Sequence, residues 1–175
     1  MLIAFIAAHP VLGVLILVGL LAATVTVAVR RIRKRTELRA LWAARAQHTE
    51  AYWTMSPKEF EHALAFLCRR DGCRDVRVVG GSGDLGADVI ATAPDGRRLV
   101  LQAKRYGPSS TVGSGDVQKV NGTYRHPHGG HLAAIVTTSR FTRPARDYAV
   151  RVGIRLFDGD ALAGWASRTG PAPWH

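Results

Sequence analysis

The sequence predicts an α/β fold, a sandwich of helices around a mixed β-sheet, preceded by one transmembrane helix. Two observations predict it. The first 29 residues contain no Asp, Glu, Lys or Arg. From residue 55 onward, short apolar and β-branched runs alternate with runs whose apolar residues recur at helical spacing, and strands mixed with helices on this scale favour an α/β sandwich. The 175 residues are enough for one ordinary domain and an appendage.

The predicted transmembrane helix covers residues 1–29, and its most apolar part, residues 11–29, is long enough to cross a bilayer. Five basic residues follow between Arg30 and Arg35, and basic residues flank the cytoplasmic end of a membrane span. We therefore expect a single-pass membrane protein with its N-terminus outside and its C-terminal domain in the cytoplasm. A cleaved signal peptide is the alternative, but no basic segment precedes the apolar run and no small-residue cleavage site is clear.

Residues 30–54 are expected to form a basic, helical juxtamembrane linker that rests on lipid headgroups. The whole chain has a net charge of +11 and a sequence pI of about 10.8, which favours a polyanionic partner, either nucleic acid or an anionic membrane surface. Residues 30–50 hold seven basic and two acidic residues, a net of +5, which leaves +6 for the rest of the chain. The domain is therefore moderately basic, which is compatible with DNA binding but does not establish it.

The soluble domain is predicted over residues 55–167, with residues 168–175 as a C-terminal tail. It opens with a helix that carries a capping box, Ser56 with Glu59 three residues later, and a proline at the first helical position. This helix is expected to end at Gly72, and a strand over 75–79 and a glycine-rich loop over 80–86 follow it. Next comes a hairpin of strands 87–92 and 99–103 joined by Pro94-Asp95-Gly96. The last expected elements are a helix over 114–124, a strand over 132–137, a helix over 142–152, a strand over 154–157 and a helix over 159–167.

The predicted hairpin carries three polar residues that can share one site. Side chains alternate between the two faces of a strand, so Gln102 and Lys104 point to the same face. A hairpin register could bring Asp88 beside them. A carboxylate, an amide oxygen and an ammonium gathered in this way can hold a hard divalent cation through the oxygens and position a water molecule for attack on a phosphate.

Five motifs occur in order and at fitting spacing over residues 55–165. They are Met55-Ser-Pro-x-Glu-Phe-Glu61, Gly80-Gly-Ser-Gly-Asp-Leu-Gly-Ala-Asp88, Gln102-Ala-Lys-Arg-Tyr106, Val136-Thr-Thr-Ser-x-Phe-Thr142 and Leu156-Phe-Asp-Gly159. With these motifs the chain resembles the Mrr-type restriction endonuclease domain, a branch of the PD-(D/E)xK nuclease superfamily. The resemblance implies a restriction-endonuclease-like α/β/α core with a mixed sheet, and cleavage of DNA phosphodiester bonds with Mg²⁺ or Mn²⁺.

The resemblance also implies roles for four residues. Asp88 matches the metal-binding aspartate, Gln102 the second acidic position and Lys104 the motif lysine, while Glu61 matches the helix glutamate that joins the site and the metal. Gln102 departs from the superfamily consensus, although it resembles the usual residue of the Mrr branch, and it lowers the charge at the metal.

We therefore expect a membrane-anchored, restriction-type endonuclease that acts on DNA, in a role against foreign DNA. Such domains often act in pairs, so a homodimer is a further expectation. Two alternatives remain open. The first is a catalytically weak or inactive DNA-binding module of the same fold, and the second is a membrane-tethered protein-interaction domain.

A further group of polar and basic residues could line a face that binds DNA phosphates, with a merely solvated surface as the alternative. These residues are Arg105, Tyr106, Gln118, Lys119, Arg140 and Arg143. Asp84 in the glycine-rich loop could brace backbone amides or lie near the metal.

The histidine and cysteine patterns favour no zinc site. His126, His128 and His131 lie in a Gly- and Pro-containing segment that is typical of a loop, and Cys68 and Cys73 have no second ligand pair nearby.

Overall fold

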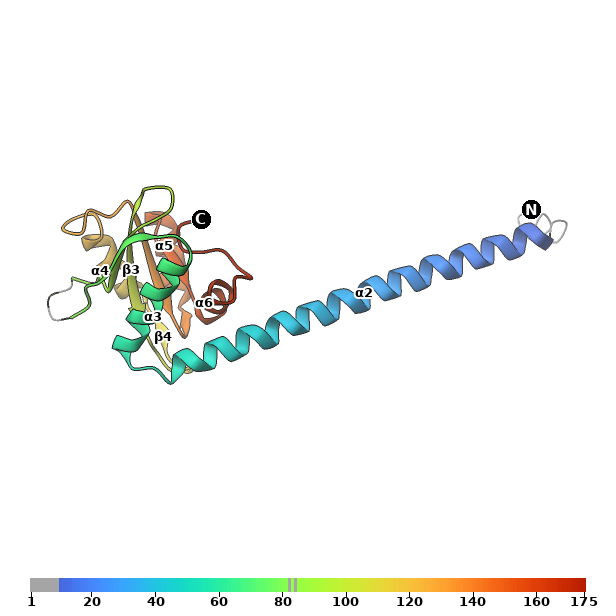
Figure 1. The fold of residues 1–175 in the computed structure, drawn as a ribbon, viewed down its shortest axis with the longest axis horizontal. Helices are drawn as coiled ribbons and strands as arrows, with labels where there is room; N and C mark the ends of the chain where they lie inside the picture. The colour runs from blue at the N-terminus through green and yellow to red at the C-terminus, as the bar shows by residue number, and fades with distance from the viewer. Residues whose placement is uncertain (1–9, 82, 84) are drawn as a thin grey trace. The chain divides into compact units, whose positions relative to one another are not determined.

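The computed structural model describes residues 10–81, 83 and 85–175 (Figure 1), so Asp84 lies outside the described residues. The chain divides into two compact units, residues 1–43 and residues 44–175. Each unit is described by itself below.

The described part of the first unit belongs to helix α2 (Pro10–Trp53), which begins in this unit and ends in the second. Its segment Val14–Lys34 has a mean hydropathy of 2.0, and none of it is buried inside the structure. By length and composition this segment could cross a membrane. The hydroxyls of Thr24 and Thr26 donate to the carbonyls of Leu21 and Ala22, so these polar groups are satisfied within the helix. Residues 10–29 of the expected transmembrane helix and residues 30–53 of the expected linker are thus consecutive parts of one helix, and residues 1–9 lie outside the described residues.

The second unit is built on a five-stranded mixed sheet in the order β1-β2-β3-β5-β7. Strands β1, β2 and β3 are antiparallel, and β3, β5 and β7 are parallel. Their bounds are β1 (Arg74–Val78), β2 (Val89–Thr92), β3 (Arg98–Lys104), β5 (Leu132–Thr137) and β7 (Arg155–Phe157). The predicted hairpin is confirmed, because β2 pairs with β3 from Val89 opposite Leu101 to Thr92 opposite Arg98.

Helices cover both faces of this sheet, which confirms the predicted α/β/α sandwich. Helices α3 (Pro57–Arg70) and α6 (Gly159–Ala166) contribute to one hydrophobic core, which contains Phe60, Trp165 and Leu101 of β3. Helices α4 (Ser114–Thr123) and α5 (Arg143–Val152) contribute to the other core, with Val117 against the face of β3 that carries Val100. Successive side chains of β3 point alternately into the two cores, so residues 100 and 102 lie on the same face of the sheet.

The predicted start of α3 is confirmed in detail. The Ser56 hydroxyl accepts a hydrogen bond from the Glu59 amide at 3.3 Å, and the Ser56 amide donates to the Glu59 carboxylate at 2.7 Å. Glu59 is therefore occupied by the capping box.

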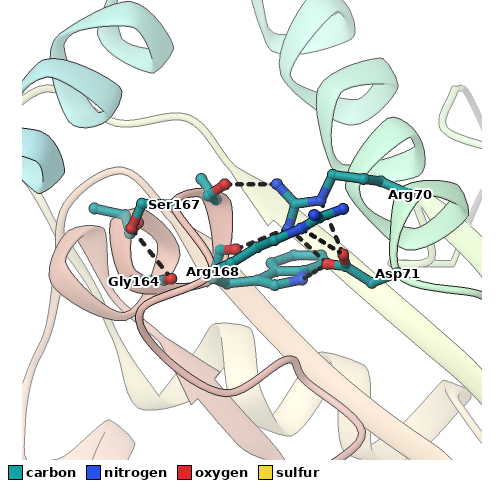
Figure 2. Close-up of polar contacts among 8 residues, drawn as sticks. Arg70, Asp71, Gly164, Ser167 and Arg168 are labelled. Atoms are coloured by element: carbon teal, nitrogen blue, oxygen red, sulfur yellow. Dashed lines mark hydrogen bonds and ion pairs between the residues drawn. The ribbon is translucent and has the colours of Figure 1, made fainter.

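The C-terminal end of α3 is joined to α6 by a half-buried polar cluster (Figure 2). The Asp71 carboxylate lies 2.6 Å from the Arg70 guanidinium and accepts a hydrogen bond of 2.9 Å from the indole of Trp165. Arg70 in turn donates to the main-chain carbonyls of Trp165 and Ala166. The hydrogen bond from Arg70 lowers the pKa of Asp71, partly opposed by burial and reinforced by Trp165 and Arg168.

Two segments outside residues 55–167 also contribute to the core of the second unit. Tyr52, in the last turn of α2, is buried and packs edge-to-face on Phe60 with ring centroids 5.7 Å apart. The indole of Trp53 donates to the Thr138 carbonyl at 2.9 Å. Trp174 is buried against Trp165, with centroids 5.8 Å apart, so the predicted tail packs on the core.

A short parallel pair that the sequence analysis missed stands beside the main sheet. Strand β4 (Thr111–Val112) pairs with β6 (Arg140–Phe141). Two-residue strands carry no readable alternation, which explains why the pattern did not predict them.

Candidate active site

The β2–β3 hairpin brings Asp88 to the segment that carries Gln102 and Lys104. The Asp88 amide donates to the Leu101 carbonyl at 2.9 Å. The Asp88 carboxylate accepts a hydrogen bond of 2.6 Å from the amide of Ala103, the residue between Gln102 and Lys104. Asp88 is 7% exposed. The carboxylate is therefore fixed at the end of the hairpin, where it reaches across to the neighbouring strand.

Gln102 is buried on the same hairpin, and its side-chain carbonyl oxygen lacks a hydrogen-bond partner among the described residues. A buried carbonyl without a partner costs about 1–3 kcal/mol, so such a group calls for an explanation. Gly86 lies beside it, with a φ of +85°, and a Cβ on Gly86 would be 3.3 Å from the Gln102 amide nitrogen. The backbone of the glycine-rich loop thus passes close over the Gln102 side chain.

Lys104 forms an ion pair with Asp116, with 3.0 Å between Nζ and Oδ1. Burial is the largest influence on the pKa of Lys104 and acts to lower it. The hydrogen bond and charge of Asp116, together with Tyr106 and Asp88, outweigh burial and raise the pKa of Lys104 above its ordinary value. The ammonium is therefore charged at neutral pH and lies within electrostatic reach of Asp88.

Asp116 was not among the predicted site residues. It lies in the first turn of α4, a position where acidic residues are common because of the helix dipole. The sequence therefore signalled only the common preference for an acidic residue in the first turn of a helix, and this preference does not predict a site residue. The contact with Lys104 depends on how α4 lies against the sheet, which the local sequence does not state.

Glu61 on α3 lies near the same hairpin end. Its carboxylate fills the space next to Gly80 that a Cβ would otherwise occupy. The amides of Val79 and Gly80 donate to the Asp88 carbonyl, at 2.8 and 3.3 Å. Gly80 therefore contacts both the Glu61 side chain and the Asp88 backbone, and links the helix glutamate to the strand aspartate.

The kinds of oxygen donor near the hairpin end fit a hard divalent cation. They are the carboxylates of Asp88 and Glu61 and the carbonyl oxygen of Gln102, which has no partner among the described residues, and Mg²⁺ and Mn²⁺ take such oxygen ligands. Within the described ranges, no three His, Cys, Asp or Glu side chains gather in one place. The third oxygen donor here is the side-chain amide of Gln102, so a metal site with three protein ligands would require Gln102.

The six predicted DNA-contacting residues fall into two groups. Near the site, the alkyl chain of Lys119 lies 3.7 Å from where a Cβ on Gly86 would be. The Arg105 Nε is buried without a partner among the described residues, and the backbone of Tyr106 is held by two hydrogen bonds with the Thr138 hydroxyl. The others are not brought to the hairpin by a described contact, and they are Gln118, Arg140 and Arg143.

Arg140 lines a cavity of about 370 Å³ beyond the carboxyl end of β5, together with Trp53, Ser139 and Arg146. Arg143 is 92% exposed and faces Asp147 at 3.9 Å. Its position is that of a solvated surface residue.

The histidine and cysteine residues take structural positions. The ring of His131 accepts a hydrogen bond from the Arg98 amide, and the carbonyl of His128 accepts one from the Arg98 guanidinium. Cys68 and Cys73 are buried free thiols.

The sequence profile of the Mrr_cat restriction endonuclease family matches residues 53–166, about two thirds of the chain. The chain belongs to this family. The restriction endonuclease domain therefore covers the hairpin, both helix layers and all the residues of the candidate site. No curated protein sequence matches the chain.

Two solved structures share the fold of the restriction endonuclease domain. The first is the MspJI restriction endonuclease in complex with a 27-mer oligonucleotide, with 23% identity and a TM-score of 0.51 over 74% of this chain. The second is the DNA modification-dependent restriction endonuclease AspBHI, with 23% identity and a TM-score of 0.51 over 76% of this chain. The matches span 31% and 35% of those chains, so this chain corresponds to about a third of each enzyme.

Proposed function

We propose that this protein is a membrane-anchored, metal-dependent endonuclease that hydrolyses DNA phosphodiester bonds in restriction of foreign DNA. The observation that carries the proposal is the buried carbonyl oxygen of Gln102, which has no partner among the described residues and lies on the hairpin that also holds Asp88 and Lys104. Family membership supports DNA as the substrate.

In this proposal Asp88, Gln102 and Glu61 hold one Mg²⁺ or Mn²⁺ ion. When bound, the ion supplies a Lewis acid that polarises the phosphate and acidifies water. Lys104 donates hydrogen bonds toward the attacking water or a phosphate oxygen and offsets the negative charge that develops there. Hydrolysis forms a bond from the water oxygen to phosphorus and breaks the bond from phosphorus to the leaving oxygen.

Lys119, Arg105 and Tyr106 are proposed to contact the DNA backbone next to the site. Lys119 lies over Gly86, and the Arg105 guanidinium has no described ion pair to occupy it. Arg140, Arg143 and Gln118 would extend this contact surface. Contacts with phosphates carry no sequence information by themselves, and they make DNA affinity fall with rising salt.

The segment Val14–Lys34 is proposed to anchor the protein in the membrane as a single span. The basic residues that follow favour a topology with the nuclease domain in the cytoplasm and the N-terminus outside. Two such chains acting as a homodimer would cut both strands of a duplex.

The proposal is tested with the full-length protein in detergent and supercoiled plasmid DNA, with Mg²⁺ or Mn²⁺. We expect nicking by the wild type and much slower nicking by Asp88→Ala and Lys104→Ala, with Lys58→Ala as a control at an exposed lysine of α3. Equal activity in all four proteins, or none in any, would reject the assignment.

A second candidate function rests on the neutral Gln102, which lowers the negative charge available to a metal. In that case the domain binds DNA without cutting it. Salt-sensitive retention of DNA by wild-type protein that never nicks the plasmid would favour this reading. Absence of DNA binding even at low salt would favour a protein-interaction domain instead.

A further inference from the structure

The motif lysine has a partner, Asp116, that lies outside the five sequence motifs. Lys104 is the last residue of β3, where it pairs with Thr137 of β5. The Thr137 hydroxyl donates to the Lys104 carbonyl at 2.7 Å. The backbone of Lys104 is therefore fixed, but its side chain still has four rotatable bonds whose freedom must be lost to hold the ammonium in place. A second fixed point is needed if the ammonium is to act at one place.

Asp116 supplies that point, because its carboxylate lies 3.0 Å from the ammonium. Val117, the next residue along α4, and Val120 are both fully buried in the core under the sheet. The helix start is thus anchored next to the carboxylate. Its position in the first turn of α4 also stabilises the negative charge of Asp116 through the helix dipole.

We propose that Asp116 is a positioning residue that holds the ammonium of Lys104 in place for DNA hydrolysis. This inference rests on the proposed function. Asp116 does not touch the substrate in this account. Its carboxylate fixes the free end of the Lys104 side chain, on the face of β3 that also carries Gln102.

The burial of the pair separates it from ordinary surface ion pairs. The side chains of Lys104 and Asp116 are 20% and 27% exposed, with 3.0 Å between the charged atoms. By contrast, Arg143 and Asp147 are 92% and 65% exposed and lie 3.9 Å apart. Exposed pairs contribute little to stability and restrain their side chains weakly.

The test compares Asp116→Ala with Asp160→Ala in full-length protein. Asp160 is the matched control because it also lies in the first turn of a helix, α6, and has no described ion pair. We expect Asp116→Ala to lower kcat for plasmid nicking about 10- to 100-fold with KM within about twofold, as for a group that acts on the transition state. Asp116→Glu should recover part of the loss. The control should keep wild-type kinetics.

Asp116→Ala is then combined with Lys104→Ala, and the nicking rate of the double variant is measured under single-turnover conditions. If Asp116 acts through Lys104, Asp116→Ala alone should lower the nicking rate. Added to Lys104→Ala, it should lower the nicking rate no further. An equal loss in both backgrounds, an unchanged kcat in Asp116→Ala, or an equal loss in Asp160→Ala would overturn the positioning role.

The two proposals fail differently. If the wild type does not nick DNA, or nicks it as well without Lys104, the proposed function fails and the role of Asp116 fails with it. If nicking depends on Lys104 but not on Asp116, only the present inference fails.

Discussion

The amide of Ala103 donates a hydrogen bond of 2.6 Å to the carboxylate of Asp88. This contact ties the aspartate to the backbone between Gln102 and Lys104, so that the three residues are held by one piece of hairpin. The carboxylate has a structural as well as a proposed metal-binding role, and substitutions must separate the two.

Asp88→Asn and Asp88→Ala should separate these roles. Asparagine keeps a side-chain oxygen that can accept the Ala103 amide, so we expect nearly wild-type thermal stability but at least a 100-fold loss of DNA nicking. Alanine leaves the amide without its partner and should also cost about 1–3 kcal/mol of stability. Thermal melting and nicking rates of the two variants check this. Wild-type nicking by Asp88→Asn would contradict the metal-binding role.

Gly86→Ala should lower the nicking rate by more than its loss of thermal stability can explain. Gly86 has a φ of +85°, which costs an L-residue about 1–2 kcal/mol. A methyl group there would also lie 3.3 Å from the Gln102 amide and displace that side chain. Gly96→Ala is the matched control, because Gly96 has a φ of +86° and open space around it. Both variants should melt earlier, and only Gly86→Ala should lose most of its nicking activity. Equal activity in the two would contradict the account.

Much of the fold could be predicted from the sequence because its signals are local. The capping box at Ser56, the hairpin turn and the alternation along β3 each depend on neighbouring residues, and each is confirmed. The pairing of Asp116 with Lys104 and the packing of Tyr52 on Phe60 depend on the angle at which separate elements pack against one another. No periodicity or motif in the local sequence carries that information.

Asp71 should make stability depend on pH in the acid range. The hydrogen bond from Arg70 lowers the pKa of Asp71 in the folded state. A lowered folded pKa contributes stability above the unfolded value of about 3.9, and the contribution is lost as pH falls through the folded pKa. The melting temperature of Asp71→Asn should therefore lie a few degrees below wild type at pH 7, and the difference should shrink below about pH 4. Asp147→Asn, at an exposed pair, serves as control. A difference that stays constant down to pH 2 would contradict this.

The end of α2 should be needed for a stable nuclease domain. A fragment of residues 44–175 keeps the contacts of Tyr52 with Phe60 and of Trp53 with Thr138, whereas a fragment of residues 55–175 loses both. Removal of a buried aromatic side chain costs about 3–5 kcal/mol, so the shorter fragment should unfold at clearly lower denaturant concentration. Chemical denaturation of the two fragments decides this, and equal midpoints would show that α2 adds nothing to the domain.

The central claim is that the buried carbonyl oxygen of Gln102 is a metal ligand, and Gln102→Leu tests it most directly. Leucine has a similar size and removes the unpartnered polar atom, so a purely structural glutamine should be replaced at no cost in activity. We predict that full-length Gln102→Leu melts at or above the wild-type temperature but loses at least 100-fold in nicking rate at a Mg²⁺ concentration that saturates the wild type. Wild-type nicking by this variant, at the wild-type Mg²⁺ dependence, would contradict the claim.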